Sequence, residues 1–217
     1  IYQCLLGEGK MTGYEVAKQT GISRSNAYNS LASMTEKGAA YLVEEGNTRK
    51  YVPVPVEEFC KNRIRRMEEA RQWLKIHVPS EKTHVEGYIT IECARNILDK
   101  MRNLLDKVEQ RVYISCTRNY LLLLVRELED LKRAGKKVVI VTDQPVTFSG
   151  AKVYVGKSRG MQIGVIADSR YVLTGEYGEG SMNTCLYSGQ KNFVELYKTA
   201  LGNEIKLLTI QEEKNKA

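Results

Sequence analysis

The sequence predicts an α+β fold built from two different halves. In the first half, Gly21 separates two short helical patterns, and a strand–turn–strand pattern follows them, as in a winged helix-turn-helix. In the second half, apolar strands alternate with a helix, which is typical of an α/β sheet covered on both faces. A chain of 217 residues is long enough for both. We therefore expect a winged helix over residues 1–56, a helical linker and dimerisation segment over 57–109, and an α/β domain over 110–217.

The first 56 residues show three helical patterns before the strands. Residues 1–8 resemble the end of a helix closed by glycines, and a second helix is expected from Thr12 to Thr20, with Gly21 ending it. Ser23 then caps a third helix, which Gly38 stops. Its apolar residues recur at the spacing of one buried face: Ala27, Leu31 and Met34.

A β-hairpin and two helical segments come next. The stretch AAYLVEEGNTRKYVPVPVEEF alternates and breaks at Gly46–Asn47, which predicts a hairpin, the wing. A helix over 57–78 follows, with apolar residues near heptad spacing, and a second helix is expected over 91–109. Each apolar stripe fits packing within one chain or across a dimer axis, and we expect at least one to be intermolecular. The heptad residues of the first are Ile64, Met67 and Leu74.

The remaining elements follow a strand–helix–strand order. RVYISCT and KKVVIVTD are expected as strands on either side of the helix NYLLLLVRELEDLKRAG. Then come AKVYVG, MQIGVIADSRYVLTGEY with a turn at Asp168–Ser169, and SMNTCLYS, before a closing helix over 192–208. This order predicts an α/β domain.

Composition excludes several classes of protein. Five scattered cysteines without a Cys-x-x-Cys pair are interpreted as free thiols in a reducing cytoplasm, mostly packed as small hydrophobic residues. Two histidines leave little for a zinc site or a histidine-based hydrolase, so we expect neither a metal nor a cofactor. No apolar run approaches the roughly 20 residues that cross a bilayer, so we expect no membrane insertion. Because the chain begins with Ile, its first residue is not expected to be the biological start.

The start of the third helix carries the candidate binding residues. Arg24, Ser25, Asn26 and Asn29 lie off the buried face, and these side chains suit base edges or phosphates. In helix-turn-helix proteins the first residues of the second helix read the DNA major groove. The alternative is that Ser23 and the polar turn after it are merely a good helix cap.

The predicted wing adds positive charge beside this helix. Asn47, Arg49 and Lys50 stand at or near its tip, where such side chains contact the DNA backbone and position the protein without specifying sequence. The formal net charge of +7 does not locate the DNA-binding face, because residues 1–56 hold six Lys or Arg against five Glu, a balance of +1.

These motifs resemble the TrmB family of transcriptional regulators. The resemblance rests on YEVAKQTGISRSNAYNSLASMTEKG and on a wing ending in RKYVPVPVEEF, and it covers residues 1 to about 59. The chain departs from the family where Gly38-Ala39-Ala40 replaces the usual Gly-Leu-Val. The resemblance implies a dimer on a pseudo-palindromic double-stranded operator, controlled by a small-molecule effector such as a sugar or sugar phosphate.

The family resemblance also implies a C-terminal domain like half of a phospholipase D fold. The catalytic motif of that fold, His-x-Lys-x-x-x-x-Asp, falls on MQIGVIAD, with Met161 and Ile163 in place of the histidine and lysine and with Asp168 kept. We therefore expect no enzyme. The alternative functions are a phospholipase D-like phosphodiesterase or nuclease with a DNA-targeting module, and an adaptor whose winged helix contacts protein.

An effector pocket is expected at the carboxyl ends of the strands, where open α/β sheets bind ligands. The polar residues there are equally explained as strand ends and helix caps, and Asp168 as a turn residue. The candidate effector residues are Thr117, Arg118, Asp143, Gln144 and Asp168.

Overall fold

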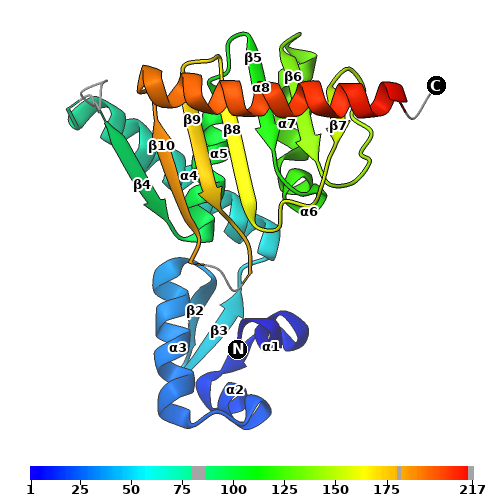
Figure 1. Ribbon diagram of the computed structural model, residues 1–217. Coiled ribbons are helices and arrows are strands. Elements are labelled where there is room, and N and C mark those ends of the chain that lie inside the picture. Colours follow the sequence, from blue (N-terminus) through cyan, green and yellow to red (C-terminus); the bar gives the residue numbers. More distant parts are fainter. Residues whose placement is uncertain (80–86, 180–181, 215–217) are drawn as a thin grey trace. The chain divides into compact units, whose positions relative to one another are not determined.

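The computed structural model describes residues 1–79, 87–179 and 182–214, and its contacts divide the chain into two units, 1–81 and 82–217 (Figure 1). Each unit has its own core and is described by itself. The division differs from the three expected segments, because residues 88–109 belong to the second unit rather than to a separate linker: residues 88–92 form an edge strand and residues 94–106 a helix that packs on the sheet.

The first unit is a winged helix-turn-helix, as predicted. A three-stranded antiparallel sheet, in the order β1-β3-β2, packs with three helices, and a longer helix follows. The two-residue strand β1 was not predicted, because it is too short to show a pattern. The elements are α1 (Tyr2–Glu8), β1 (Met11–Thr12), α2 (Gly13–Thr20), α3 (Arg24–Lys37), β2 (Ala40–Glu45), β3 (Thr48–Pro53) and α4 (Val56–His77).

Local sequence signals fix the helix-turn-helix. Thr12 and Glu15 form a capping box at the start of α2. Gly21 ends α2 in the left-handed conformation, with φ of 70°, and allows the tight turn before Ser23. The core beneath the helices is made of Leu5, Met11, Val16, Ala17, Ala27, Leu31, Ala40 and Tyr51.

Helix α4 contacts the winged helix at its first turns and buries none of its side chains within the described residues. The Tyr41 hydroxyl donates to Glu58 Oε1 at 3.2 Å, and the rings of Tyr2 and Phe59 lie 6.2 Å apart. Further along the helix, the predicted heptad residues Ile64, Met67 and Leu74 are 70%, 69% and 51% exposed.

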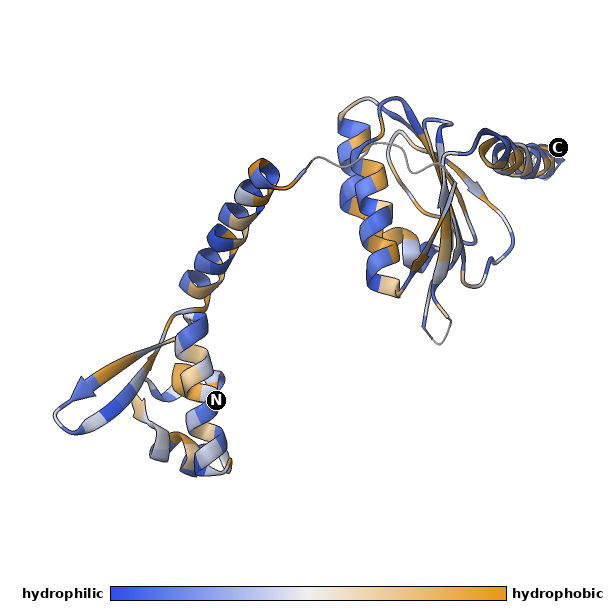
Figure 2. Ribbon diagram, turned by 90° about the vertical axis from the view of Figure 1, so that its left-hand side faces the viewer, coloured by the Kyte–Doolittle hydropathy of each residue, from blue (hydrophilic) through white to orange (hydrophobic). Residues whose placement is uncertain are grey.

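The second unit is a seven-stranded mixed sheet in the order β4-β10-β9-β8-β5-β6-β7, in which β5, β6 and β7 are parallel. Figure 2 shows this sheet nearly edge-on, with α5 and α7 on one face and α8 on the other. The elements are β4 (Tyr88–Glu92), α5 (Ala94–Asp106), β5 (Arg111–Ser115), α6 (Arg118–Leu121), η1 (Leu122–Leu124), α7 (Val125–Arg133), β6 (Lys137–Thr142), β7 (Lys152–Val155), β8 (Gln162–Ala167), β9 (Tyr171–Glu176), β10 (Thr184–Ser188) and α8 (Lys191–Lys214).

The helix expected over residues 91–109 is shorter than predicted. Residues 88–92 form the edge strand β4, which pairs along its whole length with β10, and α5 begins only at Ala94. Ile91 lies three residues before Ala94, so in the sequence it extends the helical stripe although it belongs to the strand. The apolar stripe of α5 packs within the chain through Ile97, Met101, Leu104 and Leu105.

The helix expected after β5 is broken by a 3-10 turn, η1, between α6 and α7. Leu121 and Leu124 are both fully buried at a spacing of three residues. The tighter 3-10 turn brings residues three apart to the same side, so it buries both leucines.

The cysteines are free, but they are less uniformly packed than predicted. Burial raises the pKa of Cys116 to about 12 and that of Cys185 to about 11, which leaves both thiols unreactive. Cys60 and Cys93 are exposed. None of the described helices combines the length and apolar character that crossing a bilayer requires.

Candidate nucleic-acid interface

The outer face of α3 begins with polar side chains. Because successive helical residues turn by about 100°, Ser25 and Asn29 point away from the buried Ala27 and Leu31. Ser25 and Asn29 are exposed, and their side chains make no hydrogen bond within the described part of the chain. One turn further on, Ala32 is also exposed and adds only a methyl group. This face is therefore polar, small and open to close approach.

At the start of α3, one polar residue caps the helix and the polar residues after it do not. Ser23 Oγ accepts from the backbone N–H of Asn26 at 3.4 Å, so Ser23 acts as the N-cap. The Asn26 side chain is exposed and, among the described residues, has no hydrogen-bond partner. Capping accounts for Ser23 and leaves the side chains of Ser25, Asn26 and Asn29 without a structural role.

Two exposed tyrosines near the start of α3 were not predicted as site residues, and Arg24 contacts one of them. The guanidinium carbon of Arg24 is 4.5 Å from the centre of the Tyr14 ring. Tyr28, one turn along α3 from Arg24, lies against Gly13, where an added Cβ would be 2.4 Å from Tyr28 Cε1. A signal was present: Tyr14 and Tyr28 are large aromatic residues off the apolar stripes of their helices, and they are 48% and 43% exposed.

The cations of the wing are paired with glutamates of the same hairpin. Arg49 Nε is 3.2 Å from Glu44 Oε1, and Lys50 Nζ donates to Glu45 Oε2 at 2.8 Å. Lys10, which was not predicted as a site residue, also binds Glu45. The bonds from the two lysines, Lys10 first, lower the pKa of Glu45 to about 2. Asn47 is exposed in the turn between the strands.

These exposed ion pairs hold the cations near the wing tip without fixing them. Surface pairs of this kind contribute little to stability, so a phosphate can replace a glutamate as the partner of Arg49 or Lys50. The glutamates nevertheless remain close and reduce the positive potential of the wing.

Four of the five candidate effector residues meet at the carboxyl ends of β5 and β6. Thr117 is the N-cap residue of α6, and the backbone N–H of Arg118 donates to Asp143 Oδ1 at 2.9 Å. Gln144 follows Asp143 and is exposed. One oxygen of Asp143 is thus engaged in joining the two strand ends, while the Arg118 side chain is exposed.

Asp168 lies at the opposite end of β5. In the β8–β9 turn its carboxylate accepts from the backbone N–H groups of Glu109, Gln110 and Arg111, at 2.8, 2.8 and 2.9 Å. Desolvation raises the pKa of Asp168, but these bonds together lower it below its ordinary value. The structure therefore does not bring Asp168 together with the other four residues, and its contacts fit the turn-residue alternative.

The other two motif positions have no catalytic group. Met161 precedes β8 and is 38% exposed, whereas Ile163 is 2% exposed in the core between the sheet and α5. Neither a thioether nor an alkyl chain can attack phosphorus or bind its charge.

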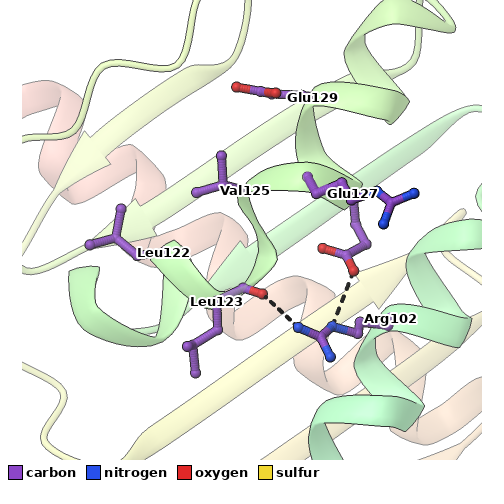
Figure 3. A pocket seen from close by; sticks show the side chains of 7 residues that line it. Arg102, Leu122, Leu123, Val125, Glu127 and Glu129 are labelled. Carbon is purple, nitrogen blue, oxygen red and sulfur yellow. Dashed lines mark hydrogen bonds and ion pairs between the residues drawn. The ribbon is translucent and has the colours of Figure 1, made fainter. Parts of the chain in front are cut away.

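A separate cavity of about 620 Å³ lies beside the 3-10 turn (Figure 3). Arg102 spans part of it: its Nη2 donates to the Leu123 carbonyl at 3.2 Å, and its Nε lies 3.1 Å from Glu127 Oε1. The lining residues are Arg102, Leu122, Leu123, Val125, Arg126, Glu127 and Glu129, and none of the candidate effector residues is among them.

A helix-turn-helix with a two-stranded wing and an exposed polar start to its second helix defines the winged-helix class of proteins. The chain belongs to the TrmB family. The family model described as "Sugar-specific transcriptional regulator TrmB" matches residues 1–57. Over 206 residues the chain is 30% identical to the uncharacterized protein YrhO of Bacillus subtilis (strain 168), covering 94% of this chain and 70% of that relative.

Solved structures show weaker similarity. TrmBL2, described as an archaeal chromatin protein with a novel mode of DNA binding, is 17% identical with a TM-score of 0.49, over 94% of this chain and 90% of its own. NucT from Helicobacter pylori is 13% identical with a TM-score of 0.46, over 55% of this chain and 96% of its own. Nuc from Salmonella typhimurium, a phospholipase D family member, is 12% identical with a TM-score of 0.42, over 54% and 92%.

Proposed function

We propose that this protein is a cytoplasmic, DNA-binding transcriptional regulator that places α3 in a major groove. The observation that carries the proposal is the outer face of α3, where Ser25, Asn26 and Asn29 are exposed without an internal partner. Exposed polar side chains are ordinary on a solvated surface, so it is their position at the start of the second helix of the motif, where helix-turn-helix proteins contact bases, that supports the proposal. Membership of the TrmB family supports the same function.

The chemistry of these side chains suits base edges. Asn can bind adenine through two hydrogen bonds, Arg24 can bind guanine in the same way, and Ser can bind either. The N-terminal end of α3 also favours nearby phosphate through its backbone N–H groups. Asn47, Arg49 and Lys50 of the wing then contact the adjacent backbone and position the reading helix.

A homodimer is part of the proposal, and α4 is its proposed interface. Four of its exposed apolar or small positions follow the alternating steps of four and three residues of a coiled-coil seam, with Arg71 between the last two. A second copy has the same stripe, so the two stripes can cover each other across a two-fold axis. It also presents two reading helices to a pseudo-palindromic operator. These positions are Cys60, Ile64, Met67 and Leu74.

The proposal also includes a small-molecule effector, a sugar or sugar phosphate, that controls DNA binding. We place its contacts at Thr117, Arg118, Asp143 and Gln144, where two parallel strands end. An effector acts on DNA binding only if it binds two geometries of the dimer with different affinity. Arg118→Ala tests this location against the separate cavity, for which Arg102→Ala is the matched variant. Loss of the effector response in Arg102→Ala alone contradicts the placement.

The second unit is not proposed as a phosphodiesterase. Two of the three chemical groups of the phospholipase D motif are replaced, by Met161 and Ile163, and Asp168 binds backbone N–H groups instead. Hydrolysis of a generic phosphodiester that disappears in Asp168→Asn contradicts this conclusion.

Fluorescence anisotropy tests the function. The protein is titrated onto its own upstream DNA and onto a scrambled duplex, at several salt concentrations and then with a panel of sugars. We expect tighter binding to one duplex and an affinity that falls steeply with salt, because neutralised phosphates release counterions. Weak, salt-insensitive binding to both duplexes contradicts the proposal and favours a protein partner for the winged helix.

A further inference from the structure

A cation–π contact between Tyr14 and Arg24 joins the two helices of the helix-turn-helix. Tyr14 belongs to the first turn of α2, and Arg24 is the first residue of α3. The guanidinium carbon lies 4.5 Å from the ring centre, within the range of a cation–π contact. The ring of Tyr14 is 48% exposed, so it has not been drawn into the core.

The surroundings of Tyr14 hold it in place. The capping box of Thr12 and Glu15 fixes the turn on which it lies, with the backbone N–H of Thr12 donating to Glu15 Oε2 at 2.7 Å. Tyr28 of α3 lies against Gly13, the residue before Tyr14, and the missing side chain of Gly13 leaves room for the Tyr28 ring. The ring that Arg24 contacts therefore belongs to α2, and Tyr28 fills the space beside Gly13, the residue before Tyr14.

The contact leaves the recognition edge of the guanidinium available. The contact is made by the ring with the guanidinium carbon, and the N–H donors of Arg24 have no hydrogen-bond partner among the described residues, so they remain able to make two parallel hydrogen bonds. A free arginine loses much side-chain freedom when it binds, and prior orientation reduces that cost.

We propose that Tyr14 is a positioning residue that orients Arg24 for bidentate contact with a guanine and so sets the sequence preference of the protein. This inference rests on the proposed function. It assigns Tyr14 a role in specificity, exerted through Arg24, rather than in contact with the DNA backbone.

A double-mutant cycle tests the inference. The full-length wild-type protein first enriches a duplex from a random double-stranded library. Affinity for that duplex, and for versions with each G·C pair replaced by A·T, is then measured for the wild type, Tyr14→Phe, Tyr14→Ala, Arg24→Ala and the double variant Tyr14→Ala/Arg24→Ala. Far-UV circular dichroism melts establish that each variant is folded.

We expect Tyr14→Phe to bind like the wild type, because the ring is kept. Tyr14→Ala is expected to weaken binding to the enriched duplex about two- to five-fold, the equivalent of one exposed cation–π contact. It is also expected to lose discrimination at one G·C pair, the same pair at which Arg24→Ala loses it. In the Arg24→Ala background, Tyr14→Ala is expected to have no further effect.

Three results overturn the inference: an equal loss in Tyr14→Phe, which indicates a hydroxyl contact; additive losses in the double variant; and an unchanged base preference in Tyr14→Ala. In all three the wild type still binds its duplex, so the proposed function survives. Failure of the wild type to enrich any duplex overturns the proposed function as well.

Discussion

The start of α3 and the strand ends of the second unit carry similar residues in different states. Asn26 and Asn29 are exposed, and within the described residues their side chains bind nothing. Asp168, in contrast, accepts three backbone hydrogen bonds. In sequence, each group is a polar cluster at the end of an element. The comparison teaches that residue type alone does not identify a binding surface. What distinguishes the two regions is whether the polar side chains already have hydrogen-bond partners within the protein.

The largest effect is expected at the open surface. Arg24→Ala should weaken DNA binding by about 1 to 3 kcal/mol and relax sequence preference, because a bidentate base contact is lost. The free energy of unfolding should change by no more than about 1 kcal/mol, the size of one exposed cation–π contact. Anisotropy and thermal melts measure the two quantities, with the exposed Arg95→Ala as control. An equal loss of affinity for every duplex would show that Arg24 contacts a phosphate and not a base.

The opposite pattern is expected at the β8–β9 turn. Asp168→Asn keeps a residue that tolerates the positive φ of 49° but loses the charge that three N–H groups face. The variant should lower the free energy of unfolding by about 1 to 2 kcal/mol, allowing for solvent screening, and leave DNA affinity unchanged. Urea unfolding measures the loss against Asp99→Asn, whose side chain is exposed. Unchanged stability with altered effector binding contradicts the structural role.

The same carboxylate predicts a pH dependence. Its pKa is lower in the folded protein than its ordinary value of 3.8, so its stabilisation is complete above that value and is lost as the pH falls through the folded pKa. The stability difference between the wild type and Asp168→Asn should therefore be largest near neutral pH and shrink below about pH 4. If the stability difference between the wild type and Asp168→Asn instead grows as the pH falls, the ionised Asp168 carboxylate is not the stabilising group.

The smallest effect is expected at the wing, because its cations Arg49 and Lys50 are already paired with glutamates of the same hairpin. Lys50→Ala should flatten the slope of log affinity against log salt by about one unit, since one phosphate contact is lost. Glu45→Gln should steepen it by about one unit, because Lys10 and Lys50 lose their carboxylate. Glu129→Gln in the second unit is the control. A changed base preference in Lys50→Ala is incompatible with a backbone contact.

Most of the fold could be predicted because its signals are local. Gly21 and Gly46–Asn47 fix turns through backbone conformation, Ser23 caps α3 through its hydroxyl, and the structure has the helix boundaries and the hairpin there. The strand β4 could not be predicted, because its pairing with β10 joins residues about a hundred positions apart. The sequence also left open whether the apolar stripe of α5 packs within the chain or against a second copy, because an apolar stripe fits either partner.

The candidate site was only partly predictable. The exposure of Arg24, Ser25, Asn26 and Asn29 follows from helical periodicity, which needs no tertiary information. The contact of Arg24 with Tyr14 and the pairing of Lys50 with Glu45 depend on side-chain directions across two elements. Asp168 and Thr117 are far apart because Asp168 binds the start of β5, whereas Thr117 follows its end. Predicting this requires the order and direction of the strands in the sheet.

The most direct test of the central claim is an NMR titration of the 15N-labelled protein with its enriched duplex. The side-chain amide signals of Asn26 and Asn29, assigned by their substitution with alanine, report the face of α3. We predict that both signals shift on binding, together with the backbone amides of the wing around Asn47, while the amides of Glu109, Gln110 and Arg111 around Asp168 stay in place. Unshifted Asn26 and Asn29 signals in a protein that binds the duplex contradict the assignment of α3 as the reading helix.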